Sequence, residues 1–303
     1  MFDMLTSRHA HLIWLLIGAF LLSACSGQQT VVAEETPTQA AAAASPTPDA
    51  PTPTPAPAAA IVNGERIPLS WYENEVERYL IAQDAMGLPV EDEDAARATV
   101  LNDLIEQVLL AQGALESGAA VSDEEVQARI DALAAESDLA AWMGVWGYTD
   151  EDLFASLKLQ ILASYQRDLI TESVLKTVEQ VQLQQIFTYA EVDAESALLS
   201  LNSGADFDDV AFSDYYDPIT GGYLGWIPRG YLLDSAVEEA VFSLPVGSYS
   251  DILESEVGYH IILVIGREEH LLTNDALLAL QRAAVYDWLE GRWENSEIEV
   301  LVD

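Results

Sequence analysis

Apolar residues recur every three to four positions through four segments in the first half of the chain, and this spacing predicts amphipathic helices. The helices are expected to begin near Ser70, Asp94, Ser122 and Thr149, and the second is expected to end at Gly118. Ser70, Ser122 and Thr149 each stand three residues before an acidic residue, which is the spacing of a capping box. The segments therefore indicate a largely helical module.

A short hairpin is expected just before the first helix, because Asn63-Gly64 lies between apolar flanks. The first helix would bury a stripe of Trp71, Val76, Tyr79 and Leu80. The second would bury one face made of Leu101, Leu104, Ile105, Val108 and Leu109. No alternating β-branched run follows the hairpin, so residues 61–178 are expected to form an all-helical domain.

The hydrophobic period changes in the second half of the chain. Strands are expected at residues 181–187, 250–253 and 259–265, and helices at residues 194–202, 207–211 and 235–242. This mixture predicts an α+β domain over residues 179–268, with one small antiparallel sheet covered by helices. A further amphipathic helix over residues 273–295 and a strand over residues 298–302 are expected at the C-terminal end.

The N-terminal residues have the pattern of an export signal. Arg8 precedes an apolar run over residues 12–22, which is too short to span a bilayer and ends in Leu22-Ser23-Ala24-Cys25. This resembles the bacterial lipoprotein signal with its lipobox, which implies that residues 1–25 are a signal and that Cys25 carries a lipid. An ordinary cleaved signal and a short membrane anchor are the alternatives. Cys25 is the only cysteine, so no internal disulfide can form.

Composition excludes several function classes. Residues 26–60 are rich in Pro, Thr and Ala, and are expected to form a disordered linker. The chain has 12 Lys and Arg against 51 Asp and Glu, a formal charge of −39, which disfavours nucleic-acid binding. Only His260 and His270 lie outside the signal, so neither a metal site nor a cofactor is expected. Phosphate-loop, dinucleotide and serine-hydrolase motifs are absent.

Four short motifs in the second half resemble the parvulin type of peptidyl-prolyl cis/trans isomerase, also called the PpiC type. They are Gly-Ala-Asp-Phe at 204–207, Gly-Gly-Tyr-Leu-Gly-Trp at 221–226, Pro-Arg-Gly at 228–230 and Gly-Tyr-His-Ile-Ile-Leu-Val at 258–264. Residues 101–110 and 121–126 resemble the N-terminal region of extracytoplasmic chaperone-isomerases of the SurA and PrsA kind. The resemblance implies a parvulin-like domain inserted in a helical body, with residues 269–303 packing back on the N-terminal module.

The resemblance also implies site residues. In the family, two core histidines and a loop Cys or Asp lie beneath the proline-binding slot. His260 matches the second histidine, whereas Gln185 stands where the first is expected. A glutamine can both donate to and accept from an imidazole, so the pairing can persist in altered form. The loop acid would be Asp214 or Asp217, and Tyr223 replaces the acid of the family's Gly-Gly-Asp-Leu-Gly motif.

The expected slot is apolar. Leu232 takes the place of the family's methionine and Val237 that of its phenylalanine, while Trp226 and Phe242 lie close to this wall in sequence. Leu232 and Val237 can equally be core residues, and His260 can be a hydrogen-bonded core histidine without a catalytic effect.

Together these features predict a membrane-tethered, extracytoplasmic peptidyl-prolyl isomerase that assists the folding of exported proteins. Its partners would be unfolded or nascent exported polypeptides with X-Pro bonds, and the membrane through the lipid anchor. The alternative is a parvulin-like chaperone with weak or no catalysis that holds unfolded clients. A structural or adhesive surface protein is disfavoured because the sequence has no internal repeat.

Overall fold

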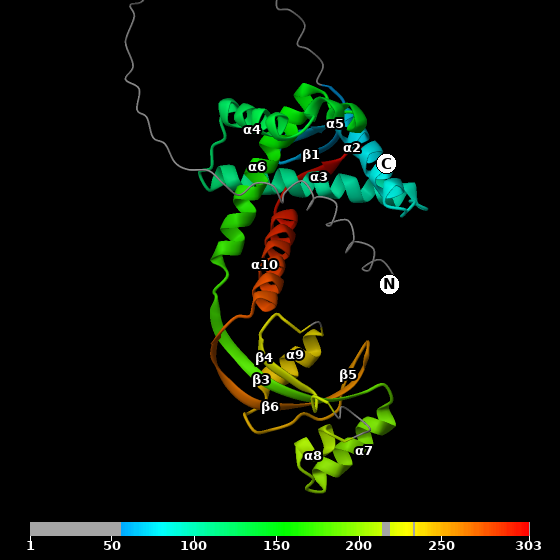
Figure 1. The fold of residues 1–303 in the computed structure, drawn as a ribbon, viewed down its shortest axis with the longest axis vertical. Helices are drawn as coiled ribbons and strands as arrows, with labels where there is room; N and C mark the ends of the chain where they lie inside the picture. Colours follow the sequence, from blue (N-terminus) through cyan, green and yellow to red (C-terminus); the bar gives the residue numbers. More distant parts are fainter. Residues whose placement is uncertain (1–55, 214–218, 233, 303) are drawn as a thin grey trace, which may run out of the picture. The chain divides into compact units, whose positions relative to one another are not determined.

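A computed structural model of the chain describes residues 56–213, 219–232 and 234–302. The expected export signal, Cys25, most of the linker and the loop acids Asp214 and Asp217 lie outside these residues. The described chain forms two compact units, shown in Figure 1. Unit 1 comprises the residues up to Leu109, then Val121–Gln160 and the residues from Ser296 onward, and unit 2 comprises Leu110–Ala120 and Ile161–Asn295.

Unit 1 contains a three-stranded antiparallel sheet in the order β2-β1-β7. Its strands are β1 (Ala58–Val62), β2 (Glu65–Pro68) and β7 (Ile298–Val300). The expected hairpin is confirmed, with Asn63 and Gly64 at positive φ values of 51° and 85° in its turn. The expected linker boundary at residue 60 is wrong, because Ala58, Ala59 and Ala60 are buried strand residues. The strand expected over residues 298–302 is confirmed as β7, which pairs with β1 next to the hairpin.

The helices of the first half confirm most of the predicted pattern. They are α2 (Leu69–Ala85), α3 (Glu93–Glu116), α4 (Asp123–Glu136), α5 (Leu139–Trp146) and α6 (Asp150–Ser173). The Ser122 side chain accepts a hydrogen bond from the Glu125 amide, and Thr149 and Asp152 cap α6 reciprocally. The predicted cap at Ser70 is wrong, because α2 starts directly after β2 and Pro68 at its N-cap makes no side-chain bond.

The buried face of α2 differs from the predicted stripe. Val76 is buried as expected, but Trp71, Tyr79 and Leu80 are half-buried. Tyr72 and the ion pair of Glu75 and Arg78 are buried in their place. The buried residues of this helix are Tyr72, Glu75, Val76 and Arg78. Helical periodicity alone cannot reveal a buried pair of charges. In α3, by contrast, all five expected core residues are buried.

Unit 2 is built on a four-stranded antiparallel sheet in the order β4-β3-β6-β5. Its strands are β3 (Thr177–Thr188), β4 (Tyr223–Pro228), β5 (Leu253–Ser255) and β6 (Gly258–Leu271). β3 and β6 are longer than expected and pair along their whole length. The hydrophobic pattern did not predict β4, and it placed β5 at residues 250–253, near an isolated bridge between Tyr249 and Leu263.

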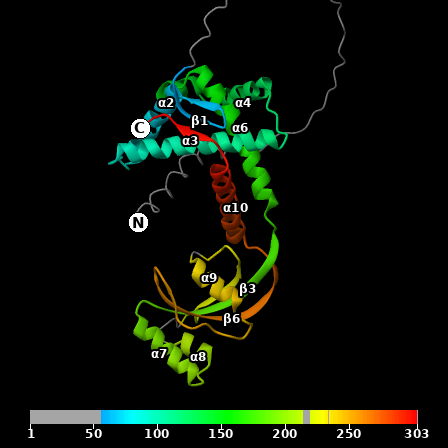
Figure 2. The ribbon, with the colours of Figure 1, turned by 180° about the vertical axis from the view of Figure 1, so that it is seen from behind.

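Helices cover both faces of this sheet, as the two opposite views in Figures 1 and 2 show. α7 (Glu191–Asn202) and α8 (Phe207–Ala211) pack on one face against Ile186 and Ile261. α9 (Ser235–Ser243) packs on the other face against Leu183, Ile262 and Val264. The predicted α+β class, with a helical N-terminal region and a small antiparallel sheet under helices, is confirmed.

The C-terminal helix α10 (Asn274–Glu294) begins at the N-cap Thr273 and belongs to unit 2. Its apolar residues Ala284, Val285, Trp288 and Leu289 pack against Leu110 of α3 and Ala163 and Ile170 of α6. These partners come from the segment that the sequence assigned to the N-terminal module, and the structure groups them with unit 2. Among the described residues, no helix is both long and apolar enough to cross a membrane.

Candidate active site

His260 lies at the centre of the site, on β6, which is an inner strand of the sheet. Its main-chain partners are Phe187 on β3 and Leu253 on β5. The Phe187 ring packs against the imidazole with ring centroids 5.0 Å apart. His260 is half-buried, and it faces the side of the sheet that α9 covers, because Ile262, two residues on, lies in the core beneath α9.

Among the described residues, two polar side chains contact the imidazole in addition to the Phe187 ring. The Nδ1 atom of His260 lies 3.4 Å from Oε1 of Gln185, and its Nε2 atom lies 2.7 Å from Oγ of Ser255. With the Gln185 oxygen as an acceptor, Nδ1 carries the proton. Nε2 then accepts from the Ser255 hydroxyl, whose other available acceptor, the Gly258 carbonyl, is farther away at 3.2 Å. The structure thus brings Gln185 and His260 together and adds Ser255, which the sequence did not identify.

Burial lowers the pKa of His260 below its usual value, and the nearby Asp234 carboxylate opposes this effect. Desolvation is the larger of the two effects, so the neutral imidazole is favoured down to a lower pH than for an exposed histidine. Asp234 itself is the N-cap of α9 and accepts from the amides of Ala236 and Val237, each at 2.9 Å. A neutral His260 matches the hydrogen bonds that Gln185 and Ser255 make.

The Gly221-Gly222 turn fixes the backbone of Gln185. The Gln185 amide donates to the carbonyl of Gly222 at 2.8 Å, and the side chain of Gln184 donates to the carbonyl of Gly221 at 2.9 Å. Both glycines have positive φ, 61° and 71°. A Cβ on Gly222 would collide with the carbonyl oxygen of Gln185. The backbone conformation of this turn therefore explains why glycine stands at both positions, and a phosphate-binding role is not needed to explain them.

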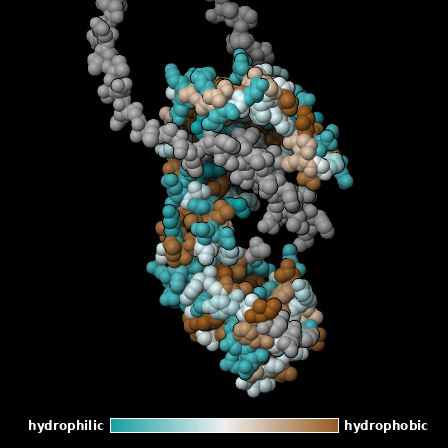
Figure 3. Space-filling view, viewed as in Figure 1, coloured by the Kyte–Doolittle hydropathy of each residue, from teal (hydrophilic) through white to brown (hydrophobic). Residues whose placement is uncertain are grey.

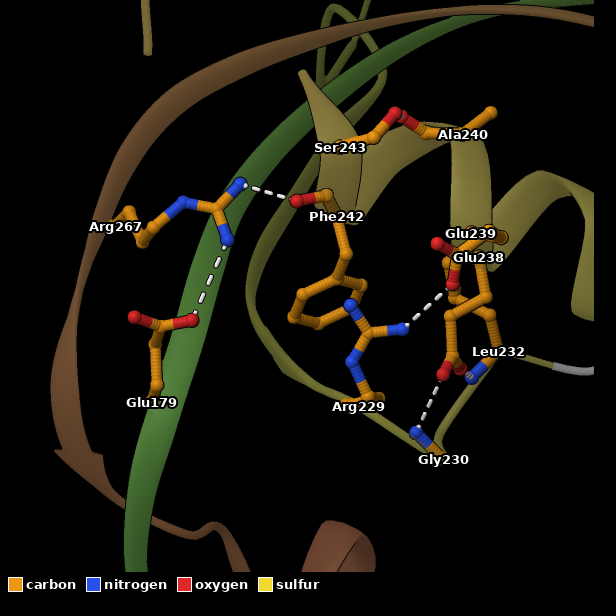
Figure 4. Close-up of polar contacts among 10 residues, drawn as sticks. All are labelled: Glu179, Arg229, Gly230, Leu232, Glu238, Glu239, Ala240, Phe242, Ser243 and Arg267. Atoms are coloured by element: carbon orange, nitrogen blue, oxygen red, sulfur yellow. Dashed lines mark hydrogen bonds and ion pairs between the residues drawn. The ribbon is translucent and has the colours of Figure 1, made fainter. Parts of the chain in front are cut away.

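A buried carboxylate holds the loop that carries Leu232. Glu238 on α9 is 8% exposed and accepts from the amide of Gly230 at 2.7 Å and from that of Leu232 at 3.2 Å (Figure 4). Its charge is compensated by these backbone donors, in the manner of a helix cap. Leu232 is half-buried and packs against the core beneath α9. The Arg-Gly motif of the sequence thus forms the start of a pinned loop.

Val237 and Phe242 lie within the same core, at 6% and 7% exposure. Phe242 is covered by a cation: the guanidinium carbon of Arg229 lies 4.4 Å from the centre of its ring, and Figure 4 shows Arg229 between the ring and Glu239. Arg267 donates to the Phe242 carbonyl at 2.9 Å. Val237 and Phe242 are therefore core residues beneath α9, and Leu232, which packs against this core, is more accessible than either.

Trp226 is not brought together with these residues. It pairs with Gln182, whereas its neighbour Ile227 pairs with Val181 and lies in the core beneath α9. Because successive residues of a strand point to opposite faces, Trp226 lies on the other face of the sheet from Ile227. There its ring packs on His270, with centroids 4.0 Å apart. Trp226 was expected near the apolar slot because it is close to it in sequence. The alternation of side chains along β4 instead places it on the opposite face of the sheet from His260.

Sequence reasoning missed Ser255 and Phe187. Ser255 reaches His260 because β5 and β6 form a tight hairpin in which Ser255 pairs with Gly258. The two turn residues between them, Glu256 and Val257, are not a typical turn pair, so the hairpin gave no strong signal. The sequence did contain a signal for Phe187. It lies two residues after Gln185, so the two side chains share one face of a strand.

Prolyl isomerisation needs no activated nucleophile, and none is seen among the residues of the site that the structure describes. Amide resonance sets a barrier of about 18–20 kcal/mol, which falls when the bond is twisted and its solvent removed. An apolar wall and a fixed, neutral imidazole can supply such surroundings. In the part of the chain that the structure describes, no three His, Cys, Asp or Glu side chains lie together as metal ligands would.

Family comparisons identify two domains in the chain. Residues 52–154 match the SurA-like N-terminal domain, and residues 175–266 match the PPIC-type PPIase domain. The second match spans Gln185, His260 and Ser255 as well as the glycine motif at 221–226. The first spans the hairpin and the helices α2 to α5.

Individual relatives and one solved structure are similar to parts of the chain. The foldase protein PrsA of Caldanaerobacter subterraneus subsp. tengcongensis is 28% identical over 229 residues, which cover 67% of this chain and 71% of the relative. The chaperone SurA of Methylobacillus flagellatus is 24% identical over 245 residues, covering 69% of this chain and 56% of the relative. A solved structure of the peptidylprolyl isomerase PrsA from Bacillus anthracis is 22% identical, with a TM-score of 0.42, and covers 64% of this chain and 96% of its own. The chain therefore contains a SurA-like N-terminal domain followed by a PPIC-type peptidyl-prolyl cis/trans isomerase domain.

Proposed function

We propose that this protein is a peptidyl-prolyl cis/trans isomerase and chaperone that assists the folding of exported proteins. The observation that carries the proposal is the position of His260 between Gln185 and Ser255, in a PPIC-type domain and on the sheet face that also carries the Leu232 wall. Slow X-Pro isomerisation limits the folding of many proteins, so catalysis of this step has a clear use.

Each group has a distinct role in this proposal. Leu232 contacts the proline ring of the substrate, and Val237 and Phe242 support it from the core. His260 faces the amide that is twisted, while Gln185 and Ser255 fix its ring and proton position. Asp214 or Asp217 remains the proposed loop acid from the resemblance. No covalent intermediate is formed, and the rate gain comes from the apolar surroundings of the amide.

The activity is tested with a panel of tetrapeptides that differ in the residue before proline, with the cis/trans rate read by a coupled protease. The full chain is expected to raise the rate above background for at least some members, in proportion to protein concentration. Rates equal to background for every peptide would contradict the isomerase proposal. A parallel assay measures whether the protein suppresses aggregation of an unfolded client.

Gln185 favours a second candidate, a chaperone with weak catalysis. At 3.4 Å its contact with His260 is long, and an amide cannot take up a proton as the expected histidine can. Gln185→His distinguishes the candidates: a large gain of rate means that the native site is impaired. An unchanged rate, together with clear activity of the unaltered chain, supports full catalysis with glutamine in place.

The expected partners are unfolded exported polypeptides, consistent with the foldase and chaperone names of the relatives. We place the protein outside the cytoplasm on the same ground, and we propose a lipid anchor at Cys25 because of the lipobox pattern. Cys25→Ser is expected to release the protein from membranes into the soluble fraction. A variant that stays membrane-bound contradicts the anchor.

A further inference from the structure

Helix α5 in unit 1 is strongly apolar, yet none of its residues is buried. Trp142, Met143 and Trp146 are half-buried, and Val145 is 68% exposed. A helix of eight residues with this composition would normally bury one face against a core. In Figure 3, apolar residues gather on the visible surface over the part of unit 1 that carries α2 and α5 in Figure 1. Such a surface commonly marks an interaction site.

The base of this helix is fixed and not loosely attached. Arg78 on α2 donates to the carbonyls of Trp146 at 2.9 Å and Gly147 at 3.1 Å, which satisfies the C-terminal end of α5. Its guanidinium carbon also lies 3.6 Å from the centre of the Tyr148 ring. The exposed apolar side chains are thus presented on a well-anchored helix, and local unfolding is not needed to expose them.

Aromatic rings add a further property to this surface. The ring of Trp142 stacks on Tyr148, with centroids 5.2 Å apart, and lies 6.5 Å from the ring of Trp146. The half-exposed indoles offer faces that attract Lys and Arg side chains. Arg78 already uses Tyr148 in this way. The exposed part of the cluster therefore suits a partner with both apolar and cationic groups.

The charges around α5 also favour a partner with cationic groups. Residues 136–152 contain five carboxylates and no Lys or Arg. Four of these acids are exposed: Glu136, Asp138, Asp150 and Glu151. Asp138 caps the N-terminus of α5, and Asp150 begins α6 just after its C-terminus. An apolar strip with acids at both ends is complementary to a segment in which apolar residues alternate or mix with basic ones.

We propose that α5 and its flanking acids form a docking surface for unfolded polypeptide segments that are apolar and basic. The proposal rests on the chaperone part of the proposed function and adds where clients bind and which ones are preferred. Binding here places a client on unit 1, whereas the isomerase residues lie in unit 2. Acidic segments and uncharged polar segments are poor partners.

The test uses the full chain and three 12-residue peptides, one of Leu and Lys, one of Ser and Lys, and one of Leu and Glu. Isothermal titration is expected to show clear binding of the Leu/Lys peptide alone, and raising the salt from 50 to 500 mM should weaken it roughly tenfold. Val145→Ser should weaken this binding about fivefold, because the most exposed apolar contact of α5 is lost.

Val192→Ser is the matched control, since Val192 is also on a helix, 62% exposed, and lies in unit 2. It should leave the affinity unchanged, and both variants should keep the tetrapeptide isomerase rate of the unaltered chain. Equal binding of the Leu/Glu peptide, or unchanged affinity after Val145→Ser, would overturn the proposal. So would a loss of self-association in Val145→Ser, because α5 would then contact a second copy of the chain.

These readouts separate the two proposals. Absent peptide binding with normal isomerase rates contradicts the docking surface only. Absent isomerase activity with peptide binding that depends on Val145 contradicts catalysis and leaves the docking surface intact.

Discussion

The glycine motif beside the site allows a sharp prediction, because two of its glycines have similar backbone conformations but differ in the space around them. Gly222 has φ +71° and Gly225 has φ +80°, a region that other residues rarely adopt. A Cβ on Gly225 would meet no atom within 4 Å, whereas a Cβ on Gly222 would collide with the carbonyl oxygen of Gln185. Alanine at either position has the backbone cost, but only Gly222→Ala has the collision.

The magnitudes follow from these contacts. The left-handed conformation costs an alanine roughly 1–2 kcal/mol, which is the whole effect expected for Gly225→Ala. Gly222→Ala must also move the turn away from β3, which breaks the 2.8 Å hydrogen bond from the Gln185 amide to the Gly222 carbonyl. That loss and the displaced packing add about 2 kcal/mol, giving roughly 3–4 kcal/mol in total.

Hydrogen exchange of the full chain measures this difference where it arises. Protection of the β3 amides over residues 181–187 should fall roughly tenfold in Gly225→Ala and roughly several-hundredfold in Gly222→Ala. The isomerase rate should fall with Gly222→Ala, because Gln185 shifts, and should hold in Gly225→Ala. Equal protection and equal rates in the two variants would refute the claim that the turn positions Gln185.

Two further predictions concern polar contacts. Ser255→Ala removes the hydroxyl that donates to the neutral His260, so the pKa of His260 should rise toward its usual value. The acid limb of the rate against pH should then move to higher pH, and Ser255→Thr should restore it. Arg78→Met leaves Glu75 buried without its ion pair, so urea unfolding should show unit 1 destabilised by about 3 kcal/mol at pH 7. Burial raises the pKa of Glu75, so this loss should shrink as the pH falls and the carboxylate is protonated, and a constant loss from pH 7 to 5 would contradict this account.

The direction of the His260 shift also fixes the pH dependence of stability. Its folded pKa is lowered, chiefly by burial, so the imidazole favours the folded state least when it is charged. The stability that the neutral imidazole lends to the folded state is complete at pH values above the unfolded pKa of about 6.5. It is lost as the pH falls through the lower pKa of the folded state. The isomerase rate should accordingly stay level as the pH falls to about 6.5 and decrease only below it.

The sequence predicted those elements that are stabilised by contacts between residues close together in the chain. Ser122 and Thr149 were recognisable as caps because their bonds lie within one helical turn. The Asn63-Gly64 hairpin has a turn chemistry that few other conformations use. The hydrophobic period over residues 181–187 and 259–265 likewise located the two inner strands of unit 2, β3 and β6.

Other features depend on register and tertiary pairing, which the sequence does not show directly. Ser255 contacts His260 only because the β5–β6 hairpin turns after two residues. Trp226 is separated from His260 by the alternation of a strand that the hydrophobic pattern did not predict. The helical periodicity gave no sign that Glu75 is buried, and its burial is explained by its ion pair with Arg78, which also donates to the C-terminal end of α5.

The central claim is that His260 and its two partners form a working isomerase site. The most direct test is nuclear magnetic resonance exchange spectroscopy of an X-Pro peptide at equilibrium, with catalytic amounts of the full chain and of a His260→Ala variant. The unaltered chain should give cis/trans exchange well above the uncatalysed rate, and the variant should lose most of that gain. Exchange at the uncatalysed rate with the folded, unaltered chain, or an equal gain from the variant, would contradict it.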